Sequence, residues 1–371
     1  MSTATRAVLF DEARPLRLST GAELAPVEVA YETYGELDAD RANAVVVCHA
    51  LTGDAHASGE DGWWSTLVGP GRPIDTDRYF VICANLLGGC SGTTGPSSTD
   101  PRTGAAYGLR FPLLHMRDLV AVHRALVAHL GIDRLHAAVG GSLGGMQVLQ
   151  WALDHPGEIE RGVLICASAR LTAMNTGFTA AARAAIMRDP DFHDGDYAAH
   201  GTAPRTGLVV ARMMAHLTYM SEEALRRKFD RARRVTDARM AFDDDFEVEH
   251  YLTHQGEVFP ERFDALSYLY LTRVMDYFAP FEDPQLDLAA VDTAFQVLSF
   301  DTDWRFGTEH SQYLAAQLRA GGVAVDDEEI ASPWGHDSFL LDVPEYHAAV
   351  ARFLAAPAPA SRVAGTPPSA D

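Results

Sequence analysis

Ser142 is the residue of this sequence whose surroundings best suit a catalytic nucleophile. Residues 140–144 read GGSLG, which matches the pattern G-x-S-x-G. A short apolar run, residues 137–139, precedes the pattern, and a run with helical spacing, Met146 to Leu153, follows it. A sharp turn between a strand and a helix lifts the serine hydroxyl clear of the sheet and points the helix N-terminus toward it. The alternative is a glycine-rich turn with an incidental serine.

A serine hydroxyl becomes an effective nucleophile when a base takes its proton and a carboxylate orients that base. For a serine on such a turn, the order along the chain is serine, then acid, then histidine. Asp301 and Asp303 follow the apolar run at residues 294–300, and His336 lies in the loop after the last predicted strand. We therefore expect a triad of Ser142, Asp303 and His336, with Asp301 as the alternative acid. Because the chain has 15 histidines, an unrelated surface position is the alternative for His336.

The negative charge that develops on the attacked carbonyl oxygen needs hydrogen-bond donors, which backbone N–H groups supply. One donor is expected to be the N–H of Leu143, directly after the nucleophile. The other is expected from the loop that follows the apolar run Ala44–Cys48, where Leu51 is the best-placed residue. Both groups belong to the main chain, so side-chain identity says little about them.

Continuous apolar runs predict the strands that position these residues, because such runs are typical of parallel strands buried on both faces. Such runs predict strands at 44–48, 79–83, 162–167 and 294–300; a further strand is expected at 323–330, and antiparallel strands between 16 and 34. Helical patterns at 116–130, 311–320 and 343–354 alternate with them. From about residue 171 to 281 the sequence has helical spacing and no strand pattern, which indicates an inserted helical cap on an α/β sheet. Ligands in such sheets bind at the carboxyl ends of the strands.

The expected domain plan follows from these patterns. A mostly parallel sheet with helices on both faces is expected over 15–170 and 285–355, with the cap at 171–284. Residues 1–14 are expected to be loose, and the Pro/Ala-rich tail, 356–371, to be disordered. The loop from Asn85 to Pro96 is rich in small residues, which suggests tightly packed backbone; a flexible surface loop is the alternative.

Composition limits the possible partners. The 371 residues include 47% hydrophobic residues and carry a net charge of −21, which argues against binding nucleic acid or an anionic membrane. An anionic substrate would therefore need a local basic pocket. The four cysteines show no metal-ligand or disulfide spacing, so we expect reduced thiols. The sequence shows no signal peptide and no apolar run of about 18 residues, which favours a cytoplasmic location.

The sequence resembles the homoserine O-acyltransferases of the α/β-hydrolase superfamily, enzymes that start methionine synthesis. Eight motifs between about residues 15 and 355 carry the resemblance in order: HALTGDAHASG, GWW, NLLGGCSGTTGPSS, RFP, GGSLGGMQ, ARMMAHLTY, DTDWRF and GHDSFLL. The resemblance implies that Ser142 is the nucleophile, Asp303 the orienting acid and His336 the base. It further implies that Arg212 holds the substrate carboxylate and that Asp337 holds its amino group, as a zwitterionic amino acid requires.

The acyl donor is expected to depend on Arg305, two residues after Asp303. The resemblance implies an apolar residue there in members that transfer acetyl and an arginine in members that transfer succinyl. A guanidinium can pair with the terminal carboxylate of succinyl in two-pronged fashion, whereas acetyl offers nothing to pair with. The alternatives for Arg305 are a solvent-facing position or a contact with a coenzyme phosphate.

The sequence therefore predicts an L-homoserine O-succinyltransferase that uses succinyl-CoA as a co-substrate, with no permanently bound cofactor and no metal. Four alternatives stay open: acetyl-CoA as the donor, L-serine as the acceptor, a plain esterase, and a non-catalytic binding protein on the same fold. The resemblance also implies a homodimer, which the helical cap is expected to form.

Overall fold

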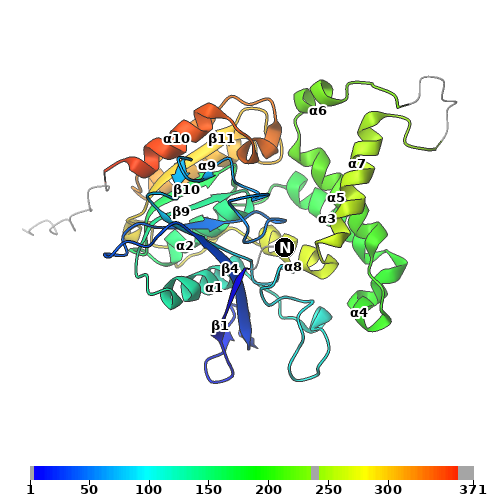
Figure 1. Ribbon diagram of the computed structural model, residues 1–371, viewed down its shortest axis with the longest axis horizontal. Helices are drawn as coiled ribbons and strands as arrows, with labels where there is room; N and C mark the ends of the chain where they lie inside the picture. Colours follow the sequence, from blue (N-terminus) through cyan, green and yellow to red (C-terminus); the bar gives the residue numbers. More distant parts are fainter. Residues whose placement is uncertain (1–3, 235–241, 358–371) are drawn as a thin grey trace, which may run out of the picture.

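The computed structural model describes residues 4–234 and 242–357. Within these ranges an eight-stranded sheet forms the centre of the molecule (Figure 1). Its strands, in spatial order, are β1 (Thr5–Phe10), β4 (Val27–Tyr34), β8 (Phe80–Ala84), β5 (Ala44–Cys48), β9 (Leu135–Gly141), β10 (Ile159–Ile165), β11 (Ala294–Phe300) and β12 (Val325–Ile330). The pairs β1–β4 and β4–β8 are antiparallel, and the other neighbours are parallel.

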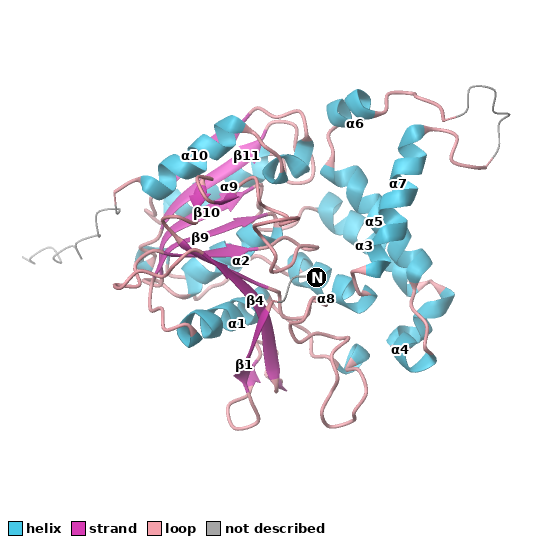
Figure 2. Ribbon diagram, in the orientation of Figure 1, coloured by secondary structure: helices cyan, strands magenta, loops and turns pink. Residues whose placement is uncertain are grey.

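Helices cover both faces of the sheet, as Figure 2 shows. One face packs against α1 (Met116–His129), α2 (Leu143–Asp154) and α9 (Thr308–Ala320), and the other against α10 (Pro344–Ala355). In β5, Val46 belongs to the first core and Val45 and Val47 to the second, because successive side chains of a strand point to opposite faces. The predicted α/β architecture is confirmed. No helix in the described ranges combines the length and the apolar composition that a membrane span requires.

The chain between β10 and β11 is helical and lies beside the sheet (Figure 2). Its helices are α3 (Ala173–Met187), α4 (Tyr197–His200), α5 (Arg205–Tyr219), α6 (Glu222–Lys228), α7 (Glu247–Val258) and α8 (Ala265–Asp276). Within it, α3 and α5 make the most extensive contact, and α7 packs against α5. We call residues 171–284 the cap. Their position places α5 over the carboxyl ends of the parallel strands.

The prediction of a loose N-terminus is wrong for residues 5–10, which form β1 at the edge of the sheet. β1 pairs with β4 from Thr5↔Tyr31 to Phe10↔Val27. Backbone hydrogen bonds hold this strand rather than side-chain burial, since only Ala7 of its side chains is buried. Sequence pattern therefore gave no signal for it. The tail expected to be disordered lies, from residue 358 onward, outside the described residues.

The loop of small residues after β8 has tightly packed backbone, as the first of the two interpretations of its sequence predicted. Residues 85–89 and 93–96 are buried. The side chain of Asn85 accepts a hydrogen bond from the N–H of Ala55 and donates one to the carbonyl of Ser91. Thr93 and Thr94 of the loop accept hydrogen bonds from backbone N–H groups of β4, so the loop connects the segment after β5 to the antiparallel edge of the sheet.

Candidate active site

Ser142 lies at the turn between β9 and α2, in a strained backbone conformation with φ 57° and ψ −122°. Its side chain is nearly buried, with 6% of the residue exposed. The flanking glycines permit the turn: a Cβ on Gly140 would lie 2.2 Å from the carbonyl carbon of Gly144, and a Cβ on Gly144 would lie 2.0 Å from the carbonyl oxygen of Cys48. Strain of this kind persists where surrounding structure holds it and is typical of functional sites. The predicted elbow is therefore present.

The structure places Asp303, and not Asp301, against His336. Oδ2 of Asp303 accepts a hydrogen bond from Nδ1 of His336 at 2.7 Å, and both side chains are buried. Oδ1 of Asp303 accepts from the N–H groups of Arg305 and Phe306 at 2.9 and 3.0 Å. Asp301 instead accepts from the N–H of Ser332 at 2.8 Å.

These contacts set the charge of Asp303 and the tautomer of His336. Burial by itself would raise the pKa of Asp303, but its interaction with His336 and the two backbone donors lower that pKa below the ordinary value. A carboxylate only accepts hydrogen bonds, so Nδ1 of His336 carries a proton and the neutral ring keeps its lone pair on Nε2. That Nε2 is buried and has no hydrogen-bond partner within the described ranges. The ring is therefore held as a base.

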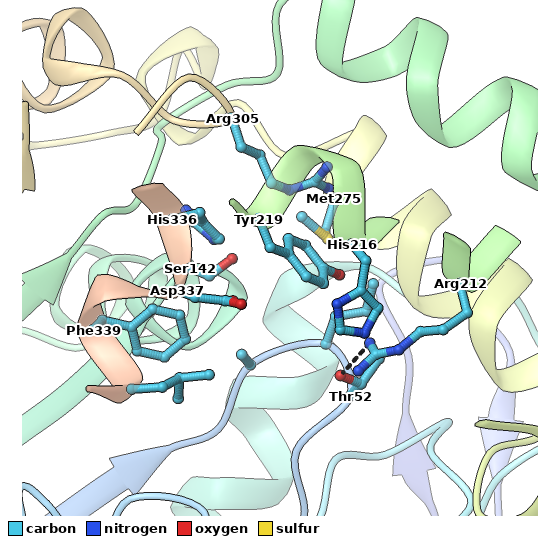
Figure 3. A pocket seen from close by; sticks show the side chains of 13 residues that line it. Thr52, Ser142, Arg212, His216, Tyr219, Met275, Arg305, His336, Asp337 and Phe339 are labelled. Carbon is cyan, nitrogen blue, oxygen red and sulfur yellow. Dashed lines mark hydrogen bonds between the residues drawn. The ribbon is translucent and has the colours of Figure 1, made fainter. Parts of the chain in front are cut away.

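Ser142 and His336 line the same cavity, about 190 Å³ in volume, beneath α5 of the cap. Figure 3 shows Ser142, His336 and Asp337 on one side of the cavity and the guanidinium groups of Arg212 and Arg305 on the other. The remaining lining residues come from the loop after β5, from the cap and from the segment after His336: Ala50, Leu51, Thr52, His216, Tyr219, Met275, Phe339 and Leu340. The side chains predicted for the site line this one cavity, with the exception of Asp303, which bonds Nδ1 of His336 and is not part of the lining.

Of the two predicted oxyanion donors, Leu51 lines the cavity and Leu143 directly follows Ser142. Leu143 is the first residue of α2, and Leu51 lies in the loop after β5. Within the described part of the chain, neither backbone N–H donates to another protein group. Two such N–H groups beside a serine hydroxyl are the donors that could stabilise the anion of a tetrahedral intermediate.

Arg212 and Asp337 supply one cation and one anion to the cavity. Arg212 projects from α5, donates to Oγ1 of Thr52 at 3.3 Å and stacks over the ring of Phe259 at 4.7 Å. No carboxylate among the described residues lies within ion-pair distance of it. Burial raises the pKa of Asp337 to about 6, although His336, and then Arg212, oppose that rise. The pair suits a small zwitterion.

Arg305 lies two residues after Asp303 and is buried, with 6% of the residue exposed. Its Nη1 donates to Oγ1 of Thr218 at 3.0 Å, and its guanidinium lies 5.7 Å from the ring centre of Tyr219 and 5.4 Å from that of Phe306. No carboxylate in the part of the chain that the structure describes pairs with it. A solvent-facing position, one of the alternatives, is thus excluded.

Sequence reasoning missed two lining residues of α5, His216 and Tyr219. Burial, together with the positive charge of Arg212, lowers the pKa of His216 to about 3, so its ring is neutral. The spacing 212, 216, 219 was the available signal, because residues three and four apart share one face of a helix. If Arg212 faces the cavity, His216 and Tyr219 are expected to face it as well.

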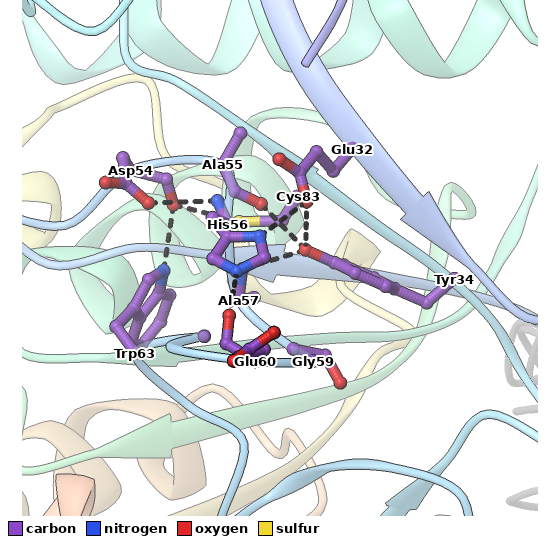
Figure 4. Close-up of polar contacts among 12 residues, drawn as sticks. Glu32, Tyr34, Asp54, Ala55, His56, Ala57, Gly59, Glu60, Trp63 and Cys83 are labelled. Atoms are coloured by element: carbon purple, nitrogen blue, oxygen red, sulfur yellow. Dashed lines mark hydrogen bonds and ion pairs between the residues drawn. The ribbon is translucent and has the colours of Figure 1, made fainter. Parts of the chain in front are cut away.

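The loop after β5 is anchored to β4 by the cluster shown in Figure 4. Nδ1 of His56 bonds a carboxylate oxygen of Glu32 at 2.9 Å, and Nε2 bonds the carbonyl oxygen of Glu60 at 2.6 Å. Tyr34 donates to Glu32 at 2.7 Å and accepts from the N–H of Ala57 at 2.9 Å. The carbonyl of Glu60, and then Glu32, raise the pKa of His56. The cluster fixes the far end of the loop that carries Leu51.

None of the four cysteines lines the cavity, although Sγ of Cys166 lies within 4.8 Å of side-chain atoms of Asp303 and His336. All four are free; Cys48, Cys83 and Cys166 are buried, whereas Cys90 is half-buried. Burial raises the pKa of each buried thiol. These side chains are therefore neutral thiols, and the lower pKa that marks a reactive cysteine is missing from them.

Comparison with known proteins agrees with this geometry. Residues 43–343 match the family model described as the alpha/beta hydrolase fold. A homoserine O-succinyltransferase of Nocardioides sp. is 60% identical over 94% of this chain and 97% of its own length. A homoserine O-acetyltransferase of Nitrobacter hamburgensis is 50% identical over 94% of this chain and 90% of its own length. The crystal structure of homoserine O-acetyltransferase from Bacillus anthracis superposes with a TM-score of 0.87 at 26% identity, over 97% of this chain and 100% of that one.

The family model spans most of the chain, and both relatives cover nearly all of it. The resemblance inferred from the eight motifs is therefore confirmed. The chain belongs to the homoserine O-acyltransferase family, a group of enzymes with the α/β-hydrolase fold.

Proposed function

We propose that the protein transfers a succinyl group from succinyl-CoA to the hydroxyl of L-homoserine, through a succinyl ester of Ser142. The observation that carries the choice of donor is the buried, carboxylate-free guanidinium of Arg305 in the same cavity as the nucleophile. The name of the 60% identical relative supports the same donor. Acetyl transfer is the second candidate, because the relative that is 50% identical is named an acetyltransferase.

In the first half-reaction, Oγ of Ser142 attacks the thioester carbonyl while Nε2 of His336 takes the hydroxyl proton. The carbonyl oxygen becomes an anion that the N–H groups of Leu51 and Leu143 stabilise. The carbon–sulfur bond then breaks, His336 returns the proton to the sulfur, and free coenzyme A leaves. Asp303 stays ionised throughout and stabilises the imidazolium that forms during each transfer.

In the second half-reaction, Arg212 and Asp337 hold the carboxylate and the ammonium of homoserine, so that its hydroxyl points at the ester. His336 takes the hydroxyl proton, the homoserine oxygen attacks the carbonyl, and the bond to Ser142 breaks with return of the proton to Oγ. The cavity walls contributed by α5 favour the amino acid over bulk water as the acceptor. Succinyl-CoA is a co-substrate in this scheme, which involves no permanently bound cofactor and no metal.

The geometry around Arg305 supports a carboxylate-binding role. Its backbone N–H donates to Oδ1 of Asp303 at 2.9 Å, which places the base of the Arg305 side chain directly beside the triad. Thr218 engages one of its terminal nitrogens and leaves other guanidinium N–H groups for a ligand. An unpaired buried cation is costly, and a carboxylate on the acyl group would remove that cost.

Replacement of Arg305 by leucine should reverse or erase the donor preference. We expect kcat/KM for succinyl-CoA to fall about 10- to 100-fold, since a charged hydrogen bond contributes roughly 1.5–3 kcal/mol. The value for acetyl-CoA should stay within a few-fold or rise. Steady-state kinetics with both donors measures the ratio. Arg305→Lys is the matched control, because it keeps the charge but loses the two-pronged geometry. Its ratio of kcat/KM for succinyl-CoA to kcat/KM for acetyl-CoA should lie between the ratios of the wild type and of Arg305→Leu. A wild-type preference for acetyl-CoA that survives in Arg305→Leu would contradict the assignment.

Binding of homoserine should weaken as the pH falls through about 6. The ionised form of Asp337 binds the ammonium group, and the pKa of this carboxyl is raised to about 6, so the binding form is lost on acidification. The Ser142→Ala variant isolates binding from chemistry. Its dissociation constant for homoserine, measured by calorimetry, should rise up to about tenfold for each pH unit below that pKa. Asp337→Asn should bind weakly at every pH. A constant affinity between about pH 5 and 7 would contradict this role.

Dimer formation through the cap and a cytoplasmic location stay predictions. Exposed apolar side chains on α3, α5 and α7 support the first, among them Met187, Val210 and Val258. Sedimentation equilibrium of the full chain would measure the oligomeric state.

A further inference from the structure

We propose that Gln147 is a positioning residue that sets the distance between the two backbone donors of the oxyanion hole. It lies one turn along α2 from Leu143 and is completely buried. Its side chain reaches across to the loop after β5, which carries the second donor, Leu51. The inference rests on the proposed acyl transfer and assigns Gln147 no contact with the substrate.

The side-chain amide of Gln147 bonds both segments that form the hole. Its Nε2 donates to the carbonyl oxygen of Leu143 at 3.1 Å and to the carbonyl oxygen of His49 at 3.2 Å. Carbonyl oxygens only accept hydrogen bonds, so the nitrogen end of the amide must face them. One NH₂ group thus joins the first turn of α2 to the end of β5.

His123 of α1 locks that orientation from behind. Its Nε2 donates to Oε1 of Gln147 at 2.8 Å, and the bond is buried. Burial lowers the pKa of His123 to about 4, so the ring is neutral near pH 7 and its single proton is on Nε2, where the amide oxygen accepts it. The ring lies parallel to that of Trp151, at an angle of 5°. Rotation of the amide would break all three hydrogen bonds at once.

Each donor peptide is also fixed locally. In the loop, Nδ1 of His49 bonds the carbonyl oxygen of Ala50 at 2.7 Å, while Nε2 of the same ring accepts from the N–H of Leu86 at 3.2 Å. In a trans peptide the C=O and N–H point in opposite directions. Holding the carbonyl of Ala50 on one side therefore turns the N–H of Leu51 to the other side, toward the cavity.

The donor peptide at the elbow is oriented in the same way. The carbonyl oxygen of Ser142 accepts from the N–H of Met146 at 3.2 Å, which turns the N–H of Leu143 the opposite way. These local bonds orient each donor within its own segment. The pairing of β5 with β9 ends at Cys48↔Gly140, and beyond it the amide of Gln147 bonds to both segments and holds the two donors at their separation.

That separation matters because oxyanion donors act at 2.7–3.1 Å from the developing charge, and a misplacement of about 1 Å can cost about 100-fold in rate. Loss of the amide should therefore slow acyl transfer and weaken binding of tetrahedral anions, while binding of ground-state homoserine should be unaffected. A general loss of packing would instead weaken the binding of every ligand and lower the melting temperature of the protein.

The experiment compares Gln147→Met with Gln150→Met. Methionine keeps the length of the side chain but cannot donate, and Gln150 is a matched control on the same helix, where it bonds Asp154 rather than the oxyanion segments. Three quantities are measured: the rate constant of Ser142 acylation by succinyl-CoA in rapid-mixing experiments, the affinity for an alkyl boronic acid that forms a tetrahedral anion on Ser142, and the affinity for homoserine.

We expect Gln147→Met to lower the acylation rate constant and the boronate affinity in parallel, each about 10- to 100-fold, with homoserine affinity within about twofold of wild type. Gln150→Met should change none of the three by more than about twofold. If Gln147→Met does not fold, His123→Phe removes the lock on the amide and should show the same selective loss, at about three- to tenfold. Suppose that the wild type forms the acyl-serine and that a folded Gln147→Met variant shows unchanged acylation and boronate binding. This inference would then be overturned, whereas the proposed function would stand. A wild type that never forms an acyl-serine would overturn the proposed function and this inference with it.

Discussion

Replacement of Ser142 by alanine is expected to lower kcat for acyl transfer by on the order of 10⁴- to 10⁶-fold. The variant lacks the oxygen that carries the acyl group, and the hole formed by Leu51 and Leu143 retains no more than a residual effect on a direct reaction. Binding of homoserine should be nearly unchanged, because Arg212 and Asp337 remain. Product formation from succinyl-CoA and homoserine, followed by chromatography, measures the loss.

Ser168→Ala is the matched control for that variant. Ser168 is also buried, and its hydroxyl bonds Nδ1 of His310 at 2.7 Å, so it belongs to a second serine–histidine pair. That pair does not line the cavity that contains His336. Activity within a few-fold of wild type is expected in Ser168→Ala. Strong residual turnover in Ser142→Ala, or a loss confined to Ser168→Ala, would show that the wrong serine has been assigned.

Replacement of Asp303 by asparagine should reduce kcat about 10⁴-fold. The amide nitrogen would face Nδ1 of His336, which favours the tautomer with its proton on Nε2, and that nitrogen then cannot accept the hydroxyl proton of Ser142. The loss of negative charge also destabilises the imidazolium formed in each transfer. Purified variant enzyme, assayed at several pH values with succinyl-CoA and homoserine, gives the comparison.

The neighbouring acid provides the control. In Asp301→Asn the side-chain oxygen can still accept from the N–H of Ser332, so activity should fall no more than a few-fold. Equal and large losses in both variants would mean that folding of this loop, rather than the ionised state of Asp303, limits activity.

Much of the site could be predicted because its residues lie in strong local patterns. The elbow at Ser142 combines a strand, two essential glycines and a helix within a few residues. β5, β10 and β11 were recognisable because strands buried on both faces are continuous apolar runs. β1 was missed because its backbone pairing with β4 leaves almost no mark on side-chain pattern.

The sequence pattern favoured Asp303 but left Asp301 as an alternative, because both acids follow the same strand. The structure decides between them through contacts that no local pattern records: the ring of His336 on one oxygen of Asp303, and two backbone donors on the other. His216 and Gln147 were missed for a related reason. Their importance depends on which elements meet in space, and α1, α2, α5 and the loop after β5 come from distant parts of the chain.

The central claim is that Ser142 carries a succinyl group between the two substrates. Intact-protein mass spectrometry after mixing with succinyl-CoA or acetyl-CoA, in the absence of homoserine, tests it most directly. We expect a mass gain of one succinyl group on wild-type protein, loss of that adduct when homoserine is added, and no adduct on Ser142→Ala. An adduct that persists in Ser142→Ala, or a wild-type protein that acetyl-CoA modifies and succinyl-CoA does not, would contradict it.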